Sequence, residues 1–385
     1  MTVNRLKGIP GFSIDRVAAA AGTDSEILRL ENLDTDLVPP KEAIEASKKA
    51  ITNDDANSYL PFTGNMDLCS AVSEHLFKQT KHKYDPEKEV LITCGGTEGM
   101  FDTLLATTDP GDEVILTDPT YAGMINRVKL AGAVPKLVPF FLKNNEWRLD
   151  LEALNSSITE KTRALFIMSP SMPSGALLNL NEWQEIAKIC CEKNVFLIYN
   201  AAMERIIYDK RPYIHPASLP GMAERTITIG SVSKEYRMIG WRVGWVVGPK
   251  KIINDISLAH IYNVVTPTGL SQTAACAALQ SSADDLNEAV GEWELRRNII
   301  VQQLKDLPII PAAGGWSMLL DVQKMGYDSF TASELLLKQG KIAATPMRDW
   351  GIQNSDQFVR FVFSNEPVDR LKDIRKRVLE ALPPR

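Results

Sequence analysis

Short and almost wholly apolar segments recur through the middle of this 385-residue chain, separated by stretches with helical spacing. The apolar segments span residues 90–93, 113–116, 164–168, 195–199, 226–229 and 243–247. Runs that are apolar at consecutive positions are typical of strands buried on both faces, as in a parallel sheet covered by helices. The sequence therefore predicts an α/β fold whose large domain has a mostly parallel sheet flanked by helices.

Polar or reactive residues follow several of these predicted strands. They are Gly96 and Thr97, Tyr121, Asn200, and Ser231 with Lys234. Ligands of open α/β sheets bind beyond the carboxyl ends of the strands, so we expect these residues to converge on one site.

The pattern changes from about residue 271 onward. Helical stretches at 273–280 and 286–304 lead to shorter strands at 315–322 and 358–363, and a last helix is predicted over 368–379. This order predicts a smaller α+β domain over residues 271–385. The large domain then covers 46–270, and the N-terminal segment 1–45 is expected to pack with the small domain.

Charge and cysteine usage exclude several classes of protein. The net charge is −5 and there is no dense Lys/Arg block, which argues against a nucleic-acid partner. The five cysteines show no CxxC spacing, so neither a disulfide framework nor a metal site is predicted.

No segment approaches the ~18 uninterrupted apolar residues of a membrane span. With no targeting signal recognised, we expect a cytoplasmic protein.

Lys234 lies in Ser231-Val232-Ser233-Lys234, at the end of a predicted strand, and Arg242 follows eight positions on. A lysine amine in this setting can form a Schiff base with an aldehyde cofactor, while hydroxyls and an arginine hold that cofactor's phosphate. The glycine-rich segment 95–99 joins a strand to a helix, and a helix N-terminus binds phosphate well. Each feature alone has a plainer interpretation. Lys234 could be a solvated surface lysine, and segment 95–99 could be a simple tight turn.

Taken together, these motifs make nearly the whole chain resemble the class I/II aminotransferases, which use pyridoxal 5′-phosphate (PLP) on the fold-type-I scaffold. The matching motifs, in order, are Tyr59 with Gly64, Gly95-Gly-Thr97, Asp118-Pro-Thr-Tyr121, Pro173-Ser-Gly175, Ser231-Val-Ser-Lys234, Arg242, and Arg360 with Ser364. The resemblance implies an enzyme that moves an α-amino group from an amino acid to a 2-oxo acid through a Lys234 Schiff base.

The resemblance also implies a role for each matching residue. Lys234 would carry PLP and shuttle a proton, Tyr121 would stack on the pyridine ring, and Arg360 would clamp the substrate carboxylate. Tyr59 would reach the phosphate of a neighbouring subunit, so a homodimer is expected. The phosphate in the same subunit would be held by Gly96, Thr97, Ser231, Arg242 and Ser233.

Three positions that touch the cofactor depart from the family pattern. Asn200 replaces an aspartate that pairs with the pyridine nitrogen, and a neutral partner makes the ring easier to deprotonate. Met203 and Met172 replace a tyrosine and an asparagine that donate to the cofactor's O3′ oxygen, which methionine cannot do. The Lys234 imine is therefore expected to have a higher pKa than is usual for the family.

Two further departures concern the substrate. Leu33 stands where the loop over the substrate usually has a glycine. Segment 259–264 lacks the arginine that aspartate-type members use for a second carboxylate, so a dicarboxylate substrate is unsupported. His260, Tyr262 and Asn263 indicate either a polar or neutral substrate side chain, or residues of a helix surface or an interface.

Two alternative functions remain open on the sequence. A weaker electron sink at Asn200 would suit a PLP-dependent lyase, racemase or oxidase acting on an amino acid. The other alternative is a non-catalytic PLP-binding relative, although the retention of Lys234, Arg242 and Arg360 favours an enzyme.

Overall fold

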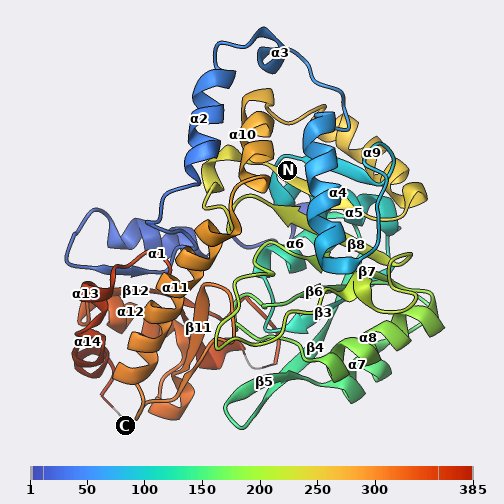
Figure 1. Cartoon of the computed structure of the whole chain (residues 1–385). Helices are drawn as coiled ribbons and strands as arrows, with labels where there is room; N and C mark the ends of the chain where they lie inside the picture. Colours follow the sequence, from blue (N-terminus) through green and yellow to red (C-terminus); the bar gives the residue numbers. More distant parts are fainter. Residues whose placement is uncertain (1–2, 12, 354, 384–385) are drawn as a thin grey trace.

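The computed structural model describes residues 3–11, 13–353 and 355–383, which form two β-sheets with helices packed around them (Figure 1). The larger sheet has the strand order β2-β9-β8-β7-β6-β3-β4-β5. Its strands are β2 (Val90–Thr93), β3 (Glu113–Asp118), β4 (Val134–Lys143), β5 (Glu146–Leu149), β6 (Thr162–Met168), β7 (Phe196–Asn200), β8 (Thr226–Ser231) and β9 (Gly244–Val247). Strands β4, β3, β6, β7 and β8 run parallel, whereas β9 and β5 are antiparallel to their neighbours. The predicted mostly parallel sheet is confirmed.

Helices cover both faces of this sheet, which explains why its strands are apolar at consecutive positions. Ile167 of β6 packs in a cluster with Trp183 on one face, while the adjacent Phe166 packs with Leu104 and Met124 on the other. The helices around the sheet are α4 (Met66–Thr80), α5 (Gly95–Thr107), α6 (Ala122–Leu130), α7 (Leu151–Ser157), α8 (Leu180–Lys193), α9 (Lys250–Asn263) and α10 (Gly269–Leu279).

The smaller sheet has the order β1-β12-β13-β11-β10, and its edge strand comes from the N-terminal segment. Strand β1 pairs in parallel with β12, and the other pairs are antiparallel. The strands are β1 (Leu28–Leu30), β10 (Ile309–Ile310), β11 (Ser317–Asp321), β12 (Ile342–Pro346) and β13 (Phe358–Val362). The division of the chain at residues 45 and 270 stays a prediction.

Helices at both ends of the sequence surround the smaller sheet (Figure 1). They are α1 (Ser13–Ala21), α11 (Ala283–Gln303), α12 (Ser329–Lys338), α13 (Val368–Leu371) and α14 (Ile374–Ala381). Helices α2 (Lys41–Ala50) and α3 (Asp54–Asn57) connect β1 to α4. Short 3₁₀ helices lie at Asn4–Leu6, Pro216–Ser218, Ile239–Trp241, Gln323–Met325 and Ser355–Gln357.

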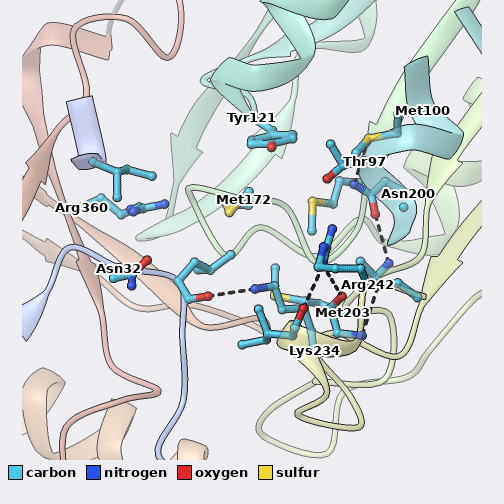
Figure 2. Close-up of a pocket in the computed structure, with 18 of the residues that line it drawn as sticks. Asn32, Thr97, Met100, Tyr121, Met172, Asn200, Met203, Lys234, Arg242 and Arg360 are labelled. Atoms are coloured by element: carbon cyan, nitrogen blue, oxygen red, sulfur yellow. Dashed lines mark hydrogen bonds between the residues drawn. The ribbon is translucent and has the colours of Figure 1, made fainter. Parts of the chain in front are cut away.

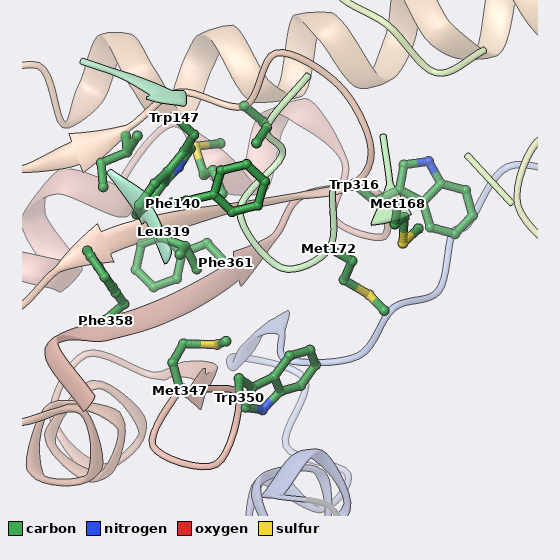
Figure 3. Packing of buried hydrophobic residues seen from close by; sticks show 14 of the residues in the cluster. Phe140, Trp147, Met168, Met172, Trp316, Leu319, Met347, Trp350, Phe358 and Phe361 are labelled. Atoms are coloured by element: carbon green, nitrogen blue, oxygen red, sulfur yellow. The ribbon is translucent and has the colours of Figure 1, made fainter. Parts of the chain in front are cut away.

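One hydrophobic cluster spans both sheets, so the two parts share a core. Figure 3 shows Phe140 and Trp147, from β4 and β5, beside side chains of the smaller sheet. Trp147 meets Phe358 edge to face, with ring centroids 5.5 Å apart. Phe361 and Leu319 belong to the same cluster. This shared core holds the small sheet against the carboxyl edge of the large one.

Three helices differ from their predicted limits. Helix α5 begins at Gly95 rather than at residue 100, so its N-terminus directly follows β2. The sequence favours Asn181 as the N-cap of α8, because helical spacing is clear only from residue 183, but Asn179 is the N-cap and forms a capping box with Glu182. The predicted last helix is two, α13 and α14. No helix in the described ranges has the length and continuous apolar character needed to cross a bilayer.

Candidate active site

Segments that follow β2, β3, β7 and β8 come together around one cavity of about 350 Å³, and the N-terminal segment and the small sheet complete its wall (Figure 2). Tyr59 lies outside it, with 84% of its surface exposed. The predicted site residues that line it are Leu33, Gly96, Thr97, Tyr121, Met172, Asn200, Met203, Ser231, Ser233, Lys234, Arg242 and Arg360. The sequence-distant motifs therefore meet in one place.

Lys234 follows β8 and points its amine at the N-terminal segment. Its Nζ donates to the Leu33 carbonyl oxygen at 2.8 Å and lies 5.0 Å from the ring centre of Trp316. Burial lowers the pKa of the Lys234 amine to about 7, and the nearby Arg242 and Arg360 cations add to the burial effect while Asp34 opposes it. A large fraction of this amine is therefore neutral and nucleophilic near neutral pH.

An anion-binding cup lies at the start of α5. Its N-cap residue, Cys94, offers no side-chain cap, so the first backbone N–H groups of the helix are available to a ligand. Gly95 has φ +74°, and a Cβ there would lie 2.5 Å from Nη2 of Arg242. The Arg242 side chain is held by the Ile239 carbonyl at 2.9 Å and by Oγ of Ser233 at 3.4 Å. Glycine thus lets a guanidinium approach the helix N-terminus closely.

Arg360 lies on β13, is fully buried, and is incompletely paired. Its Nη2 donates to the Glu31 carbonyl and to Oγ1 of Thr345, but Nε and Nη1 find no acceptor among the described residues. Its guanidinium lies 4.7 Å from the ring centre of Trp350. Burial lowers the pKa of Arg360 to about 9. A buried cation with unused donors is suited to an anionic ligand.

The loop after β3 positions Tyr121 by docking on the small sheet's side of the cavity. The Thr120 N–H donates to the Trp350 carbonyl at 2.8 Å. Oδ2 of Asp118 accepts from the N–H groups of Ile352 and Gln353, both at 3.0 Å. Tyr121 and Trp350 therefore form adjoining parts of the cavity wall, with ring centroids 6.5 Å apart.

Several residues of the cavity wall were not predicted from the sequence. They are Ile14, Asp15, Asn32, Met100, Met168, Ala202, Ile239 and Trp350. Met100 could have been found, because it lies one helical turn after Gly96 and so shares its face. Ile14 and Asp15 begin a helix far away in the sequence, and no motif marks them.

His260 and its neighbours on α9 do not line this cavity. His260 is fully buried; its Nδ1 lies 2.8 Å from Oε1 of Glu98, and its Nε2 lies 3.1 Å from the Phe62 carbonyl. Asn263 donates to Asp102 of α5, and Tyr262 is 89% exposed. His260 therefore connects α5 to the segment that carries Tyr59, rather than contacting a ligand within this chain.

Comparison with known proteins gives similarity along the whole chain. Residues 28–377 match the family described as "Aminotransferase class I and II". The chain is 32% identical to an aspartate aminotransferase of Pyrococcus abyssi, over 98% of this chain and 97% of that protein. It is 30% identical to aromatic-amino-acid aminotransferase 2 of Thermococcus litoralis, over 97% and 98%. The solved structure of N-succinyldiaminopimelate aminotransferase from Mycobacterium tuberculosis matches with a TM-score of 0.92 at 30% identity, over 98% of this chain and 99% of that one.

Proposed function

The chain belongs to the class I and II aminotransferases, and from that membership we propose that it binds PLP in the cavity of Figure 2, at Lys234. Members of this class are PLP enzymes, and the chain is accordingly an enzyme that transfers an amino group between an amino acid and a 2-oxo acid. The observation that carries the proposal is the position of the Lys234 amine in the cavity wall, where burial lowers its pKa to about 7. It lines the same cavity as an anion-binding cup and an incompletely paired arginine.

The residues present fit the cofactor's chemical groups. The close approach of the Arg242 guanidinium to the N-terminus of α5, which a Cβ on Gly95 would block, supports a phosphate site there. The phosphate would be held by Gly96, Thr97, Ser231, Ser233 and Arg242, and the ring would lie among Tyr121, Met172, Met203 and Asn200. Neither methionine can donate a hydrogen bond, so the ring's phenolic oxygen would receive none from them.

When bound, PLP supplies an aldehyde that takes up the amino group and a conjugated ring that accepts electron density from the substrate's Cα. The protein supplies the base. As a neutral amine, Lys234 would take the proton from the substrate's Cα and would deliver it to the carbon that carries the cofactor's aldehyde. The free Lys234 amine donates a hydrogen bond to the Leu33 carbonyl at 2.8 Å.

Arg360 is proposed to bind the substrate's α-carboxylate through the donors that lack partners in the structure. This contact would fix the substrate's orientation, so that Cα faces Lys234. The charged residues of the cavity wall are Lys234, Arg242, Arg360 and Asp15. Each of these three cations already has a role in the proposal, so none is left to pair with a second substrate carboxylate. Asp15 would repel such a carboxylate. A substrate side chain that is neutral or donates hydrogen bonds therefore fits better.

We also propose that two copies of the chain form a homodimer, with Tyr59 reaching the cofactor phosphate of the partner. The exposure of Tyr59 in the single chain supports this, since a tyrosine that is 84% exposed is free to contact another subunit. Phe62, in the same segment, is 49% exposed and leaves further apolar surface beside it.

Borohydride trapping tests the site of attachment. The protein is reconstituted with PLP, reduced with borohydride and analysed by peptide mass spectrometry. A pyridoxyl label on Lys234 is expected. The exposed Lys251 of α9 serves as the internal control and should stay unlabelled. A label on another lysine, or no label, would overturn the proposal.

The lowered pKa of Lys234 predicts how attachment of PLP depends on pH. The neutral amine reacts, and it dominates above a pKa of about 7 rather than the usual value of about 10.4. The rate of PLP attachment to the apoprotein should therefore rise with pH and level off above about 7. Stopped-flow absorbance measures this rate. Nα-acetyl-lysine serves as the reference amine, and its rate of reaction with PLP should keep rising toward pH 10. A protein rate that follows the reference would contradict this prediction.

A further inference from the structure

The side-chain amide of Asn200, the last residue of β7, has a fixed orientation. Its Oδ1 accepts a hydrogen bond from the backbone N–H of Ala202 at 3.1 Å. Exchanging the oxygen and nitrogen of the amide would place an NH₂ group against that N–H, two donors facing one another. Asn200 is 5% exposed, so water cannot readily compensate for such a clash. The main chain therefore fixes which end of the amide carries the oxygen.

The amide nitrogen of Asn200 is left with unused hydrogen-bonding capacity. Nδ2 carries two hydrogens, and among the described residues its hydrogen-bond partner is Sδ of Met100 at 3.6 Å. A thioether sulfur is a weak acceptor. Asn200 and Met100 both line the cavity, so this donor is available to a ligand that offers a better acceptor.

The position of the PLP ring follows from the proposed function, on which this inference rests. Lys234 would take the aldehyde carbon, and the α5 cup would take the phosphate arm on the adjacent ring atom. The ring nitrogen is para to the ring carbon that bears the aldehyde, so it would lie on the far side of the ring from Lys234. Figure 2 shows Arg360 and Asn32 on one side of the cavity, and Asn200, Met100 and Thr97 on the other. Asn200 is the amide on the side that the ring nitrogen would face.

We infer that Asn200 donates its amide N–H to the ring nitrogen of PLP, and that the enzyme therefore holds this nitrogen unprotonated. A protonated ring nitrogen would itself be a donor, and it would meet the donor end of a fixed amide. This goes beyond the expectation from the sequence, which was only that a neutral partner makes the ring easier to deprotonate. Because the Ala202 N–H occupies Oδ1 of Asn200, Asn200 would be the donor in its hydrogen bond to the ring nitrogen.

The charges around the site agree with an unprotonated ring. Of the charged groups that line the cavity, Lys234, Arg242 and Arg360 are cationic, and like charges disfavour a pyridinium. Among the described residues of the lining, Asp15, on α1, is the only anionic one. The carboxylates of α5, Glu98 and Asp102, bond to His260 and Asn263 rather than facing the cavity. No described carboxylate bonds to Asn200.

An unprotonated ring withdraws electrons less strongly than a pyridinium. Negative charge that forms when the Cα proton leaves would stay closer to Cα, within reach of Lys234. The enzyme would then depend more on prompt proton return by Lys234 and less on storage of charge in the ring. Asn200 would thus be a catalytic residue that sets the electronic state of the cofactor.

Nitrogen NMR of the reconstituted full-length protein tests this inference directly. PLP labelled with ¹⁵N in the ring is bound, and its chemical shift is followed between about pH 6 and pH 9, a range in which PLP free in solution changes its protonation state. We expect the wild-type resonance to stay at the unprotonated position throughout. In Asn200→Asp, the resonance should move by tens of ppm to the protonated position, because a carboxylate stabilises the pyridinium. Met100→Leu, which removes only the sulfur contact, should leave the wild-type shift unchanged.

The possible outcomes separate this inference from the proposed function. A protonated wild-type resonance overturns the inference, even where borohydride labels Lys234 and the proposed function stands. Failure of the labelled cofactor to attach to Lys234 overturns both. The wild-type measurement is decisive by itself, so the test does not depend on whether Asn200→Asp folds.

Discussion

Replacing Lys234 by alanine is expected to lower kcat/KM for amino-group transfer by about 10³-fold or more. The substitution removes both the amine that attaches PLP and the base that moves the Cα proton, and general base catalysis alone contributes about 10²–10⁴-fold. No other lysine is among the described residues that line the cavity. Single-turnover absorbance of the cofactor with excess amino acid measures the loss.

Two further variants distinguish a chemical role from a structural one. Lys234→Arg keeps a cation in the cavity but has no amine that can lose its proton near neutral pH, so it should be as inactive as Lys234→Ala. Lys251→Ala, at an exposed position on α9, should retain wild-type activity. Melting temperatures of the variants within a few degrees of the wild-type value would show that the fold is intact. Activity of Lys234→Arg within tenfold of the wild type would refute the proposed role.

Replacing Arg360 by lysine is expected to reduce kcat/KM for amino acids by roughly 30-fold to several thousand-fold. Removing one partner of a buried, hydrogen-bonded charge pair costs about 2–5 kcal/mol, and each 1.4 kcal/mol is about a factor of ten. A lysine keeps the charge, but it cannot present the planar set of donors that a carboxylate accepts. It would also lose the bonds from Nη2 to Glu31 and Thr345. Steady-state kinetics with a single amino acid and 2-oxo acid pair measures the effect.

The contribution of the carboxylate contact is isolated by comparing substrates. An amine that lacks the carboxylate should react poorly with the wild type and equally poorly with Arg360→Lys, because neither can make the contact. Arg348→Lys is the matched control, since that arginine is exposed and pairs with Asp356. Equal losses for substrates with and without the carboxylate would mean that Arg360 acts on the fold rather than on the substrate.

The central strands could be predicted because burial on both faces makes them rich in apolar residues. All six residues of β3 are buried, as are all six of β8. Strand β4 was missed because it lies near the edge, is largely exposed or half-buried, and contains Pro135 and Pro139. Proline within a run argues against a strand, yet near the edge of this sheet it is tolerated.

Motifs on the large sheet identified one wall of the cavity, because the carboxyl ends of parallel strands meet at one edge. The opposite wall could not be found in the same way. Asn32 and Trp350 lie in loops from opposite ends of the sequence, and the pairing of β1 with β12 draws them together. No local pattern carries that information. The fixed amide of Asn200 was also beyond the sequence, since it depends on where the Ala202 N–H points.

Leu33 meets Lys234 through its main chain, while its side chain forms part of the cavity wall. Every amino acid has a carbonyl oxygen, so exchanges at this position can preserve the tether on the lysine. The same exchanges would alter the shape offered to incoming molecules. Selectivity and reactivity are thereby separable at a single residue, and related enzymes could diversify their substrates here without rebuilding the catalytic apparatus.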